Sequence, residues 1–122
     1  MPLRYDIDSG SRIVTIKGDY AEPSEWRTLL GAIGDDPRFT HGYAFLRDLR
    51  GSNNPVSAET VIGIIAVVRQ YWNVLGVRRA AIVTRAGIDI PATIAHALAE
   101  DERIPLRAFN SYEDAIEWLG EP

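Results

Sequence analysis

The segment from residue 48 to 57 brings together the side chains of this chain that are best suited to bind an anion. It carries an acid and an arginine, Asp48 and Arg50, followed by Ser52 and Ser57. A predicted helix starts directly after Ser57, and a helix N-terminus offers free N–H groups and about half a positive charge. A phosphate would be stabilised there, as would a phosphoserine at position 52 or 57 beside Arg50. The alternative interpretation is structural, with Ser57 as the helix N-cap and Ser52 as a turn residue.

Further polar side chains follow the predicted strands. In sheets whose parallel strands alternate with helices, ligands bind outside the carboxyl ends of the strands. This rule selects a rim of strand-end residues, namely Asp19, Tyr20, Thr84, Arg85 and Asn110. The selection is geometric, and it makes the rim a candidate binding region together with the 48–57 segment.

The sequence contains none of the common enzyme motifs. It lacks the Gly-x-Ser-x-Gly elbow, the Walker loop and the Gly-x-Gly-x-x-Gly motif. Its two histidines, His41 and His96, stand alone, and it has no cysteine for a thiolate nucleophile or a metal site. Asp48 would suit a response-regulator receiver, but a receiver also needs a lysine after its fifth strand, and Lys17 is the only lysine. We therefore predict a non-catalytic protein with no metal and no cofactor.

Length and composition predict one domain over residues 1–122. The chain has 122 residues, of which 46% are hydrophobic and 25% charged, close to the average of soluble globular domains. The net charge of −4 argues against nucleic acid as a partner. No stretch reaches the ~18 apolar residues of a membrane span, and the N-terminus has no apolar signal stretch. We expect a cytoplasmic protein.

Hydrophobic periodicity predicts five strands and four helices. Alternating residues at 3–8 and a β-branched run at 13–16 predict an N-terminal hairpin, and apolar runs predict strands at 43–46, 80–83 and 106–109. Helices are predicted from Pro23, from Ser57 to Gly76, from Asp89 and from Ser111. Strands separated by helices pair in parallel through right-handed crossovers. We predict an α/β fold with a mixed, mainly parallel five-stranded sheet, and its strand order is left open.

The predicted helix over residues 58–75 is apolar around much of its circumference. Ile62, Ile64, Val67 and Tyr71 widen its apolar stripe beyond the face that one sheet would cover. The excess could be buried against a second copy of the chain, or it could line a pocket for a small apolar ligand. Burial between neighbouring helices of the same domain is the third interpretation.

The segment Asp48-Leu49-Arg50-Gly51 resembles the corresponding turn of STAS domains, which have the SpoIIAA-like fold of anti-sigma-factor antagonists. The resemblance covers nearly the whole chain. More closely, the chain is similar to a bacterial STAS/SEC14-like group of small stand-alone proteins of unassigned function. Further segments that carry it are 16–20, 23–26, 45–52, 80–83 and 114–119.

This resemblance implies a hairpin followed by parallel strand–helix units. The resemblance to the antagonists implies a regulatory phosphorylation after the third strand, where Ser57 is the best positional match. The resemblance to SEC14-like proteins implies binding of an apolar ligand. We predict a regulatory or protein-interaction module that uses the 48–57 segment, with a protein partner or a homodimer through the 58–75 helix. The alternative is a carrier or sensor of a small apolar or lipid-like ligand.

Overall fold

The computed structural model describes residues 3–19, 22–51, 57–85, 90–101 and 103–121. Within these residues the elements follow the predicted order, with five strands and four helices. The strands are β1 (Arg4–Asp8), β2 (Ile13–Lys17), β3 (Ala44–Asp48), β4 (Ala80–Val83) and β5 (Leu106–Phe109). The helices are α1 (Pro23–Asp35), α2 (Ala58–Leu75), α3 (Ile90–Asp101) and α4 (Tyr112–Leu119).

The five strands form one sheet in the order β1-β2-β3-β4-β5, which is their order along the chain. β1 and β2 pair antiparallel, with Arg4 opposite Lys17, and every later neighbour pairs in parallel. The predicted mixed, mainly parallel sheet with an N-terminal hairpin is therefore confirmed.

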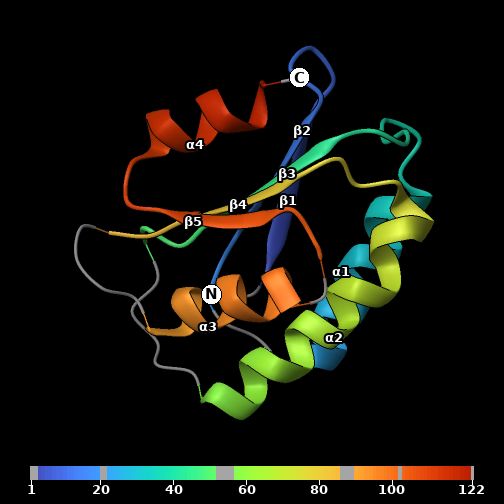
Figure 1. Cartoon of the computed structure of the whole chain (residues 1–122). Coiled ribbons are helices and arrows are strands. Elements are labelled where there is room, and N and C mark those ends of the chain that lie inside the picture. Colours follow the sequence, from blue (N-terminus) through green and yellow to red (C-terminus); the bar gives the residue numbers. More distant parts are fainter. Residues whose placement is uncertain (1–2, 20–21, 52–56, 86–89, 102, 122) are drawn as a thin grey trace.

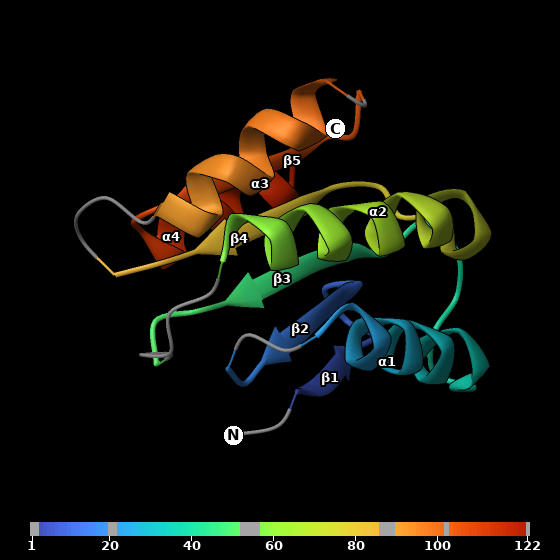
Figure 2. The ribbon, with the colours of Figure 1, turned by 90° about the horizontal axis from the view of Figure 1, so that it is seen from below.

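The sequential strand order decides which face of the sheet each helix covers. Parallel crossovers are right-handed, and here each one adds the next strand on the same side of the last. The three crossover helices consequently fall on one face, where α1, α2 and α3 lie side by side with α2 in the middle (Figures 1 and 2). α4 follows the last strand and covers the opposite face.

The central position of α2 explains its wide apolar stripe. Ile64 and Val67 are buried in a cluster with α1 and the first three strands. Val61 and Ile65 belong to a second cluster that α2 shares with α3, β4 and β5. The two sides of the stripe thus have separate neighbours within the chain. α2 begins and ends at the residues predicted from the sequence. The Ser57 hydroxyl accepts a hydrogen bond from the Thr60 N–H, and Gly76 takes the left-handed conformation.

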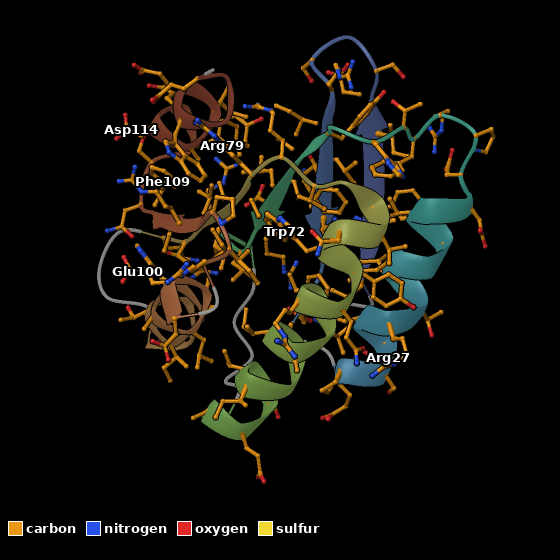
Figure 3. All side chains as sticks on the ribbon, turned by 45° about the vertical axis from the view of Figure 1, so that its right-hand side comes forward. Arg27, Trp72, Arg79, Glu100, Phe109 and Asp114 are labelled. Atoms are coloured by element: carbon orange, nitrogen blue, oxygen red, sulfur yellow. The ribbon has the colours of Figure 1, made fainter. Side chains whose placement is uncertain are left out.

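The short helix α4 is attached at its C-terminus by two arginines. Arg78 donates to the carbonyl oxygens of Leu119 and Glu121, and Arg79 donates to that of Trp118 while lying over its ring. Cations at this position satisfy carbonyl groups that lack a partner within the helix. Arg79 lies beside α4 in Figure 3, whereas Trp72 points from α2 toward the sheet.

α4 covers only part of its face of the sheet. Its buried cluster includes alanines and aliphatic side chains of β3 and β4. On the outer surface of β1 and β2, Arg4, Asp6 and Lys17 are exposed and Thr15 is half-buried. Among the described residues, none of the helices has the length and hydropathy needed to cross a lipid bilayer.

A close approach between α1 and α2 gives the first prediction. A Cβ atom at Gly63 of α2 would lie 2.7 Å from the Pro23 Cγ of α1, which is shorter than van der Waals contact. We expect Gly63→Ala to lower the free energy of unfolding by about 1–3 kcal/mol, because the helices must separate. Urea denaturation monitored by circular dichroism measures this change.

Gly31→Ala is the matched control for this substitution. Gly31 also lies within a helix, but a Cβ atom there would have no neighbour within 4 Å. Its replacement is expected to raise stability by about 0.5–1 kcal/mol, through the higher helix propensity of alanine. Equal stabilisation by both substitutions would contradict the close packing of α1 on α2.

Candidate functional site

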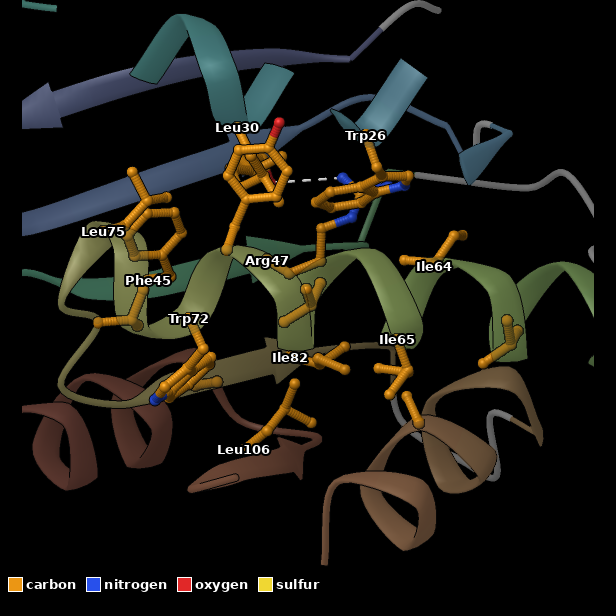
Figure 4. Close-up of a pocket in the computed structure, with 18 of the residues that line it drawn as sticks. Trp26, Leu30, Phe45, Arg47, Ile64, Ile65, Trp72, Leu75, Ile82 and Leu106 are labelled. Carbon is orange, nitrogen blue, oxygen red and sulfur yellow. Dashed lines mark hydrogen bonds between the residues drawn. The ribbon is translucent and has the colours of Figure 1, made fainter. Parts of the chain in front are cut away.

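An apolar cavity of about 90 Å³ lies beneath α2, between this helix and the sheet (Figure 4). Seven residues of α2 line it: Val61, Ile64, Ile65, Val68, Tyr71, Trp72 and Leu75. The opposite wall includes Phe45 and Ala80 from the strands, Trp26 and Leu30 from α1, and Ala95 from α3. The cavity therefore lies at the seam between the two hydrophobic clusters that share α2.

The small side chain of Ala80 helps to explain why this seam is not filled. Ala80 is partly buried and packs against both clusters, so it lies at their junction under α2. Protein interiors are usually packed as densely as organic crystals, and a void is left where side chains on facing elements are too short to meet. The cavity is thus the consequence of a long helix crossing a strand that begins with alanines.

Two polar side chains, Arg47 and Trp26, lie together at one edge of the cavity (Figure 4). Arg47 of β3 is 8% exposed, and its guanidinium carbon lies 5.2 Å from the centroid of the Trp26 ring. Its nitrogens donate to the carbonyl oxygens of Ile16 at 3.4 Å and of Asp19 at 3.2 Å. The Trp26 Nε1–H is buried and has no hydrogen-bond partner among the described residues.

Arg47 and Trp26 are not among the site residues predicted from the sequence. Alternation along β3 was the available signal, because it places Arg47 on the same side as the buried Phe45 and Leu49. An arginine within such an apolar pattern is buried only when its polar groups find partners. The carbonyl oxygens that accept the hydrogen bonds of Arg47 belong to Ile16 and Asp19, about thirty residues earlier in the chain. These partners could not be predicted from the residues around Arg47.

The four residues of α2 proposed as an apolar pocket or interface have different surroundings. Ile64 and Tyr71 line the cavity. Val67 is buried at 2% exposure within the cluster that α2 forms with α1. Ile62 is 53% exposed and lies outside the cavity. Ile64, Val67 and Tyr71 thus pack against the same cluster within the chain, whereas Ile62 lies apart from them on the exposed side of the helix.

The 48–57 segment begins with an ion pair. Arg50 Nη2 lies 2.9 Å from Asp48 Oδ2, and the guanidinium of Arg50 lies over the Tyr112 ring, 4.6 Å from its centroid. The side-chain hydrogen bond from Arg50 lowers the pKa of the Asp48 carboxyl below its usual value. Asp48 and Arg50 thus lie together at the carboxyl end of β3, where the guanidinium donates hydrogen bonds to both carboxylate oxygens.

A polar groove of about 390 Å³ adjoins this ion pair on the surface that α4 leaves uncovered. Arg4, Asp6, Thr15, Lys17, Asp48, Arg50 and Tyr112 contribute to its lining. Asp19 lines an adjoining groove with Asp48 and Arg50. The predicted residues Asp19, Asp48 and Arg50 therefore adjoin a part of the sheet surface that was not predicted from the sequence, the outward residues of β1 and β2.

The structure places the remaining rim residues near the ends of β4 and β5. Arg85 Nε donates to the Arg50 carbonyl oxygen at 2.7 Å, and the Thr84 hydroxyl donates to Asn110 Oδ1 at 3.0 Å. Ser57 is exposed, and its hydroxyl caps α2 by accepting from the Thr60 N–H at 3.1 Å. Tyr20 and Ser52 lie outside the described residues.

Comparison with known proteins identifies the fold. No protein-family model matches this chain, and no curated protein matches it. The crystal structure of an uncharacterized protein of the DUF3478 family from Shewanella loihica PV-4, described as having a SpoIIAA-like fold, is similar with a TM-score of 0.60. The two chains are 13% identical, and the similarity covers 97% of this chain and 94% of the other. This chain has a SpoIIAA-like fold, as its resemblance to STAS domains implied.

The Asp48–Arg50 ion pair gives a prediction about pH. The pKa of Asp48 is lowered in the folded chain, so the pair stabilises the fold above the unfolded-state pKa of about 3.9. This contribution is lost as the pH falls through the folded-state pKa. We expect Arg50→Gln to raise the Asp48 pKa, which a carboxyl-carbon NMR titration measures residue by residue.

Asp36 provides the control, because the side-chain hydrogen bond from Arg38 lowers its pKa in the same way. Arg50→Gln should leave the Asp36 titration unchanged, and Arg38→Gln should raise the pKa of Asp36 while leaving that of Asp48 unchanged. An Asp48 titration that does not respond to Arg50→Gln would show that the ion pair is not formed in solution.

Proposed function

We propose that this protein binds a small apolar ligand in the cavity beneath α2 and acts as a carrier or sensor without catalytic activity. The observation that carries this proposal is the cavity itself, which has a volume of about 90 Å³ and is lined mainly by aliphatic and aromatic side chains. An engineered apolar cavity of ~150 Å³ in another protein stays free of water and binds benzene or xenon. A cavity of the size found here suits a smaller group, such as a short branched alkyl chain.

The energetic cost of an empty cavity supports this proposal. Cavity formation costs roughly 24 cal/mol per Å³, which corresponds to about 2 kcal/mol for a void of about 90 Å³. This is a substantial part of a typical folding free energy of ~5–15 kcal/mol. A ligand that fills the cavity would restore dispersion contacts with its walls and would stabilise the folded chain in proportion to its concentration.

The position of α2 favours a role as a sensor. This helix lines the cavity along most of its length, from Val61 to Leu75, and it begins at the end of the 48–57 segment. A ligand that shifts α2 against the sheet would therefore move Ser57, the residue that caps this helix. The regulatory or protein-interaction role predicted for residues 48–57 is then the output of ligand binding in the cavity.

The hydrogen bonds within the 48–57 segment favour the cavity over this segment as the primary ligand site. The Asp48 carboxylate and the Arg50 guanidinium bind each other, and the Ser57 hydroxyl is used as a helix cap. An anion at this position would have to compete with Asp48 for Arg50. The apolar cavity requires no comparable exchange of partners when a ligand enters.

Filling the cavity by mutation is expected to prevent binding. Ala80→Val adds two methyl groups on the wall opposite α2, and valine is well tolerated in strands. We expect it to weaken xenon binding at least fivefold, measured by titrating the methyl NMR signals of Ile64, Val68 and Ile82. The unfolding midpoint in urea should stay the same or rise, because the added methyl groups replace a void.

Ala108→Val is the control for this substitution. Ala108 is a partly buried alanine of the neighbouring strand β5, and it does not line the cavity. The variant should bind xenon as the unmodified chain does. Methyl signals that do not respond to xenon in the unmodified chain would refute the proposed ligand site.

A further inference from the structure

β1 lies at one end of the sheet, and no strand lies beside its outer edge among the described residues (Figure 2). Its backbone pairs with β2 on one side only, and an edge strand presents unpaired N–H and C=O groups on the other. Such an edge is a template for a further strand. β1 carries three exposed charged residues, Arg4, Asp6 and Asp8. The order of these charges determines which strand fits this edge.

The charges of β1 are arranged so that a second copy of the same strand complements them. When two copies of a strand pair antiparallel about a twofold axis, one residue lies opposite itself, and the residues on either side of it lie opposite each other. With the axis at Tyr5, Arg4 of each copy lies opposite Asp6 of the other. Leu3 then lies opposite Ile7. Residues opposite each other project from the same face, so both pairs of opposite charge lie together on the outward surface of the joined sheet.

The neighbouring registers bring like charges together. An axis at Arg4 places this arginine opposite its own copy, and an axis at Asp6 does the same for the aspartate. An axis at Ile7 places Asp6 opposite Asp8. Like charges directly opposite each other destabilise a sheet. In addition, the Asp8 carboxylate accepts hydrogen bonds from two N–H groups of the hairpin turn, so it is already used within its own copy. Charge therefore selects the register with the axis at the residue between Arg4 and Asp6.

The inner face of β1 is held in place beside the end of α1. The Tyr5 hydroxyl donates to Asp36 Oδ2 at 2.9 Å, and Arg38 donates two side-chain hydrogen bonds to the same carboxylate. Ile7 is buried in the hydrophobic cluster that includes α1, and Leu3 packs against this cluster. A strand that is already fixed in its extended conformation loses little freedom when another strand adds to it, and this favours association.

We propose that this protein forms a homodimer through β1, in which the sheets of the two copies join antiparallel with the twofold axis at Tyr5. Backbone hydrogen bonds between the two strands supply the affinity, and the pairs of Arg4 with Asp6 fix the register. The surface lies apart from the cavity beneath α2, so this inference is independent of the proposed function. A strand of five residues gives a small interface, and the dimer should therefore dissociate on dilution.

Charge reversal at the two positions tests this pairing on the full chain. Arg4→Glu and Asp6→Arg each place like charges opposite one another in both pairs, and each should weaken dimerisation by about tenfold or more. The double variant Arg4→Glu/Asp6→Arg should dimerise as the unmodified chain does. A mixture of the two single variants should also dimerise, because opposite charges then face each other again. Sedimentation velocity from about 1 µM to about 1 mM measures association, and urea unfolding confirms that each variant is folded.

Ile62→Gln is the control, because Ile62 is 53% exposed on α2, the helix predicted from the sequence as a dimer interface. This variant should dimerise as the unmodified chain does. Amide hydrogen exchange gives a second measurement, since exchange in β1 should slow as the concentration of the unmodified chain rises and should not slow in Arg4→Glu.

Several outcomes would overturn this inference. They are a chain that remains monomeric up to about 1 mM, single variants that dimerise normally or that fail to associate when mixed, and β1 amides whose exchange is independent of concentration. Loss of the dimer in Ile62→Gln but not in Arg4→Glu would place the interface on α2 instead. The proposed function is tested separately, by xenon binding.

Discussion

The sequential order of the strands is the constraint on which the rest of the structure depends. Because each right-handed crossover adds a strand on the same side, three successive helices must share one face of the sheet. The middle helix, α2, is then enclosed by α1, α3 and the strands below it. Its unusually apolar composition follows from this position, since a helix with neighbours on three sides needs a wider apolar surface than one with a single neighbour.

The packing of α2 combines a close contact with a void. Gly63 allows the start of α2 to approach Pro23 of α1 closely, which fixes the position of α2 on that side. Under the middle of the helix, the small Ala80 leaves space that the surrounding side chains do not fill. The ligand role proposed above rests on this combination, because filling the space would change the contacts of α2 with the sheet.

The opposite face of the sheet has a different chemical character. α4 is held by Arg78 and Arg79 and covers the later strands, so the outward residues of β1 and β2 remain beside the Asp48–Arg50 ion pair as a polar groove. The apolar cavity and this groove lie on opposite sides of β3, which contributes Arg47 to one and Asp48 to the other. Adjacent residues of one strand thus serve two environments, as the alternation of side chains requires.

Local patterns in the sequence determined the elements and much of their connection. The alternation at residues 3–8, the cap at Ser57 and the glycine at position 76 each depend on neighbouring residues, so the hairpin, the order of elements and the ends of α2 could be predicted. Tertiary structure decided the strand order, the face that each helix covers and the candidate site. The cavity and the pairing of Trp26 with Arg47 depend on distances between segments far apart in the chain, and periodicity within a segment carries no information about those distances.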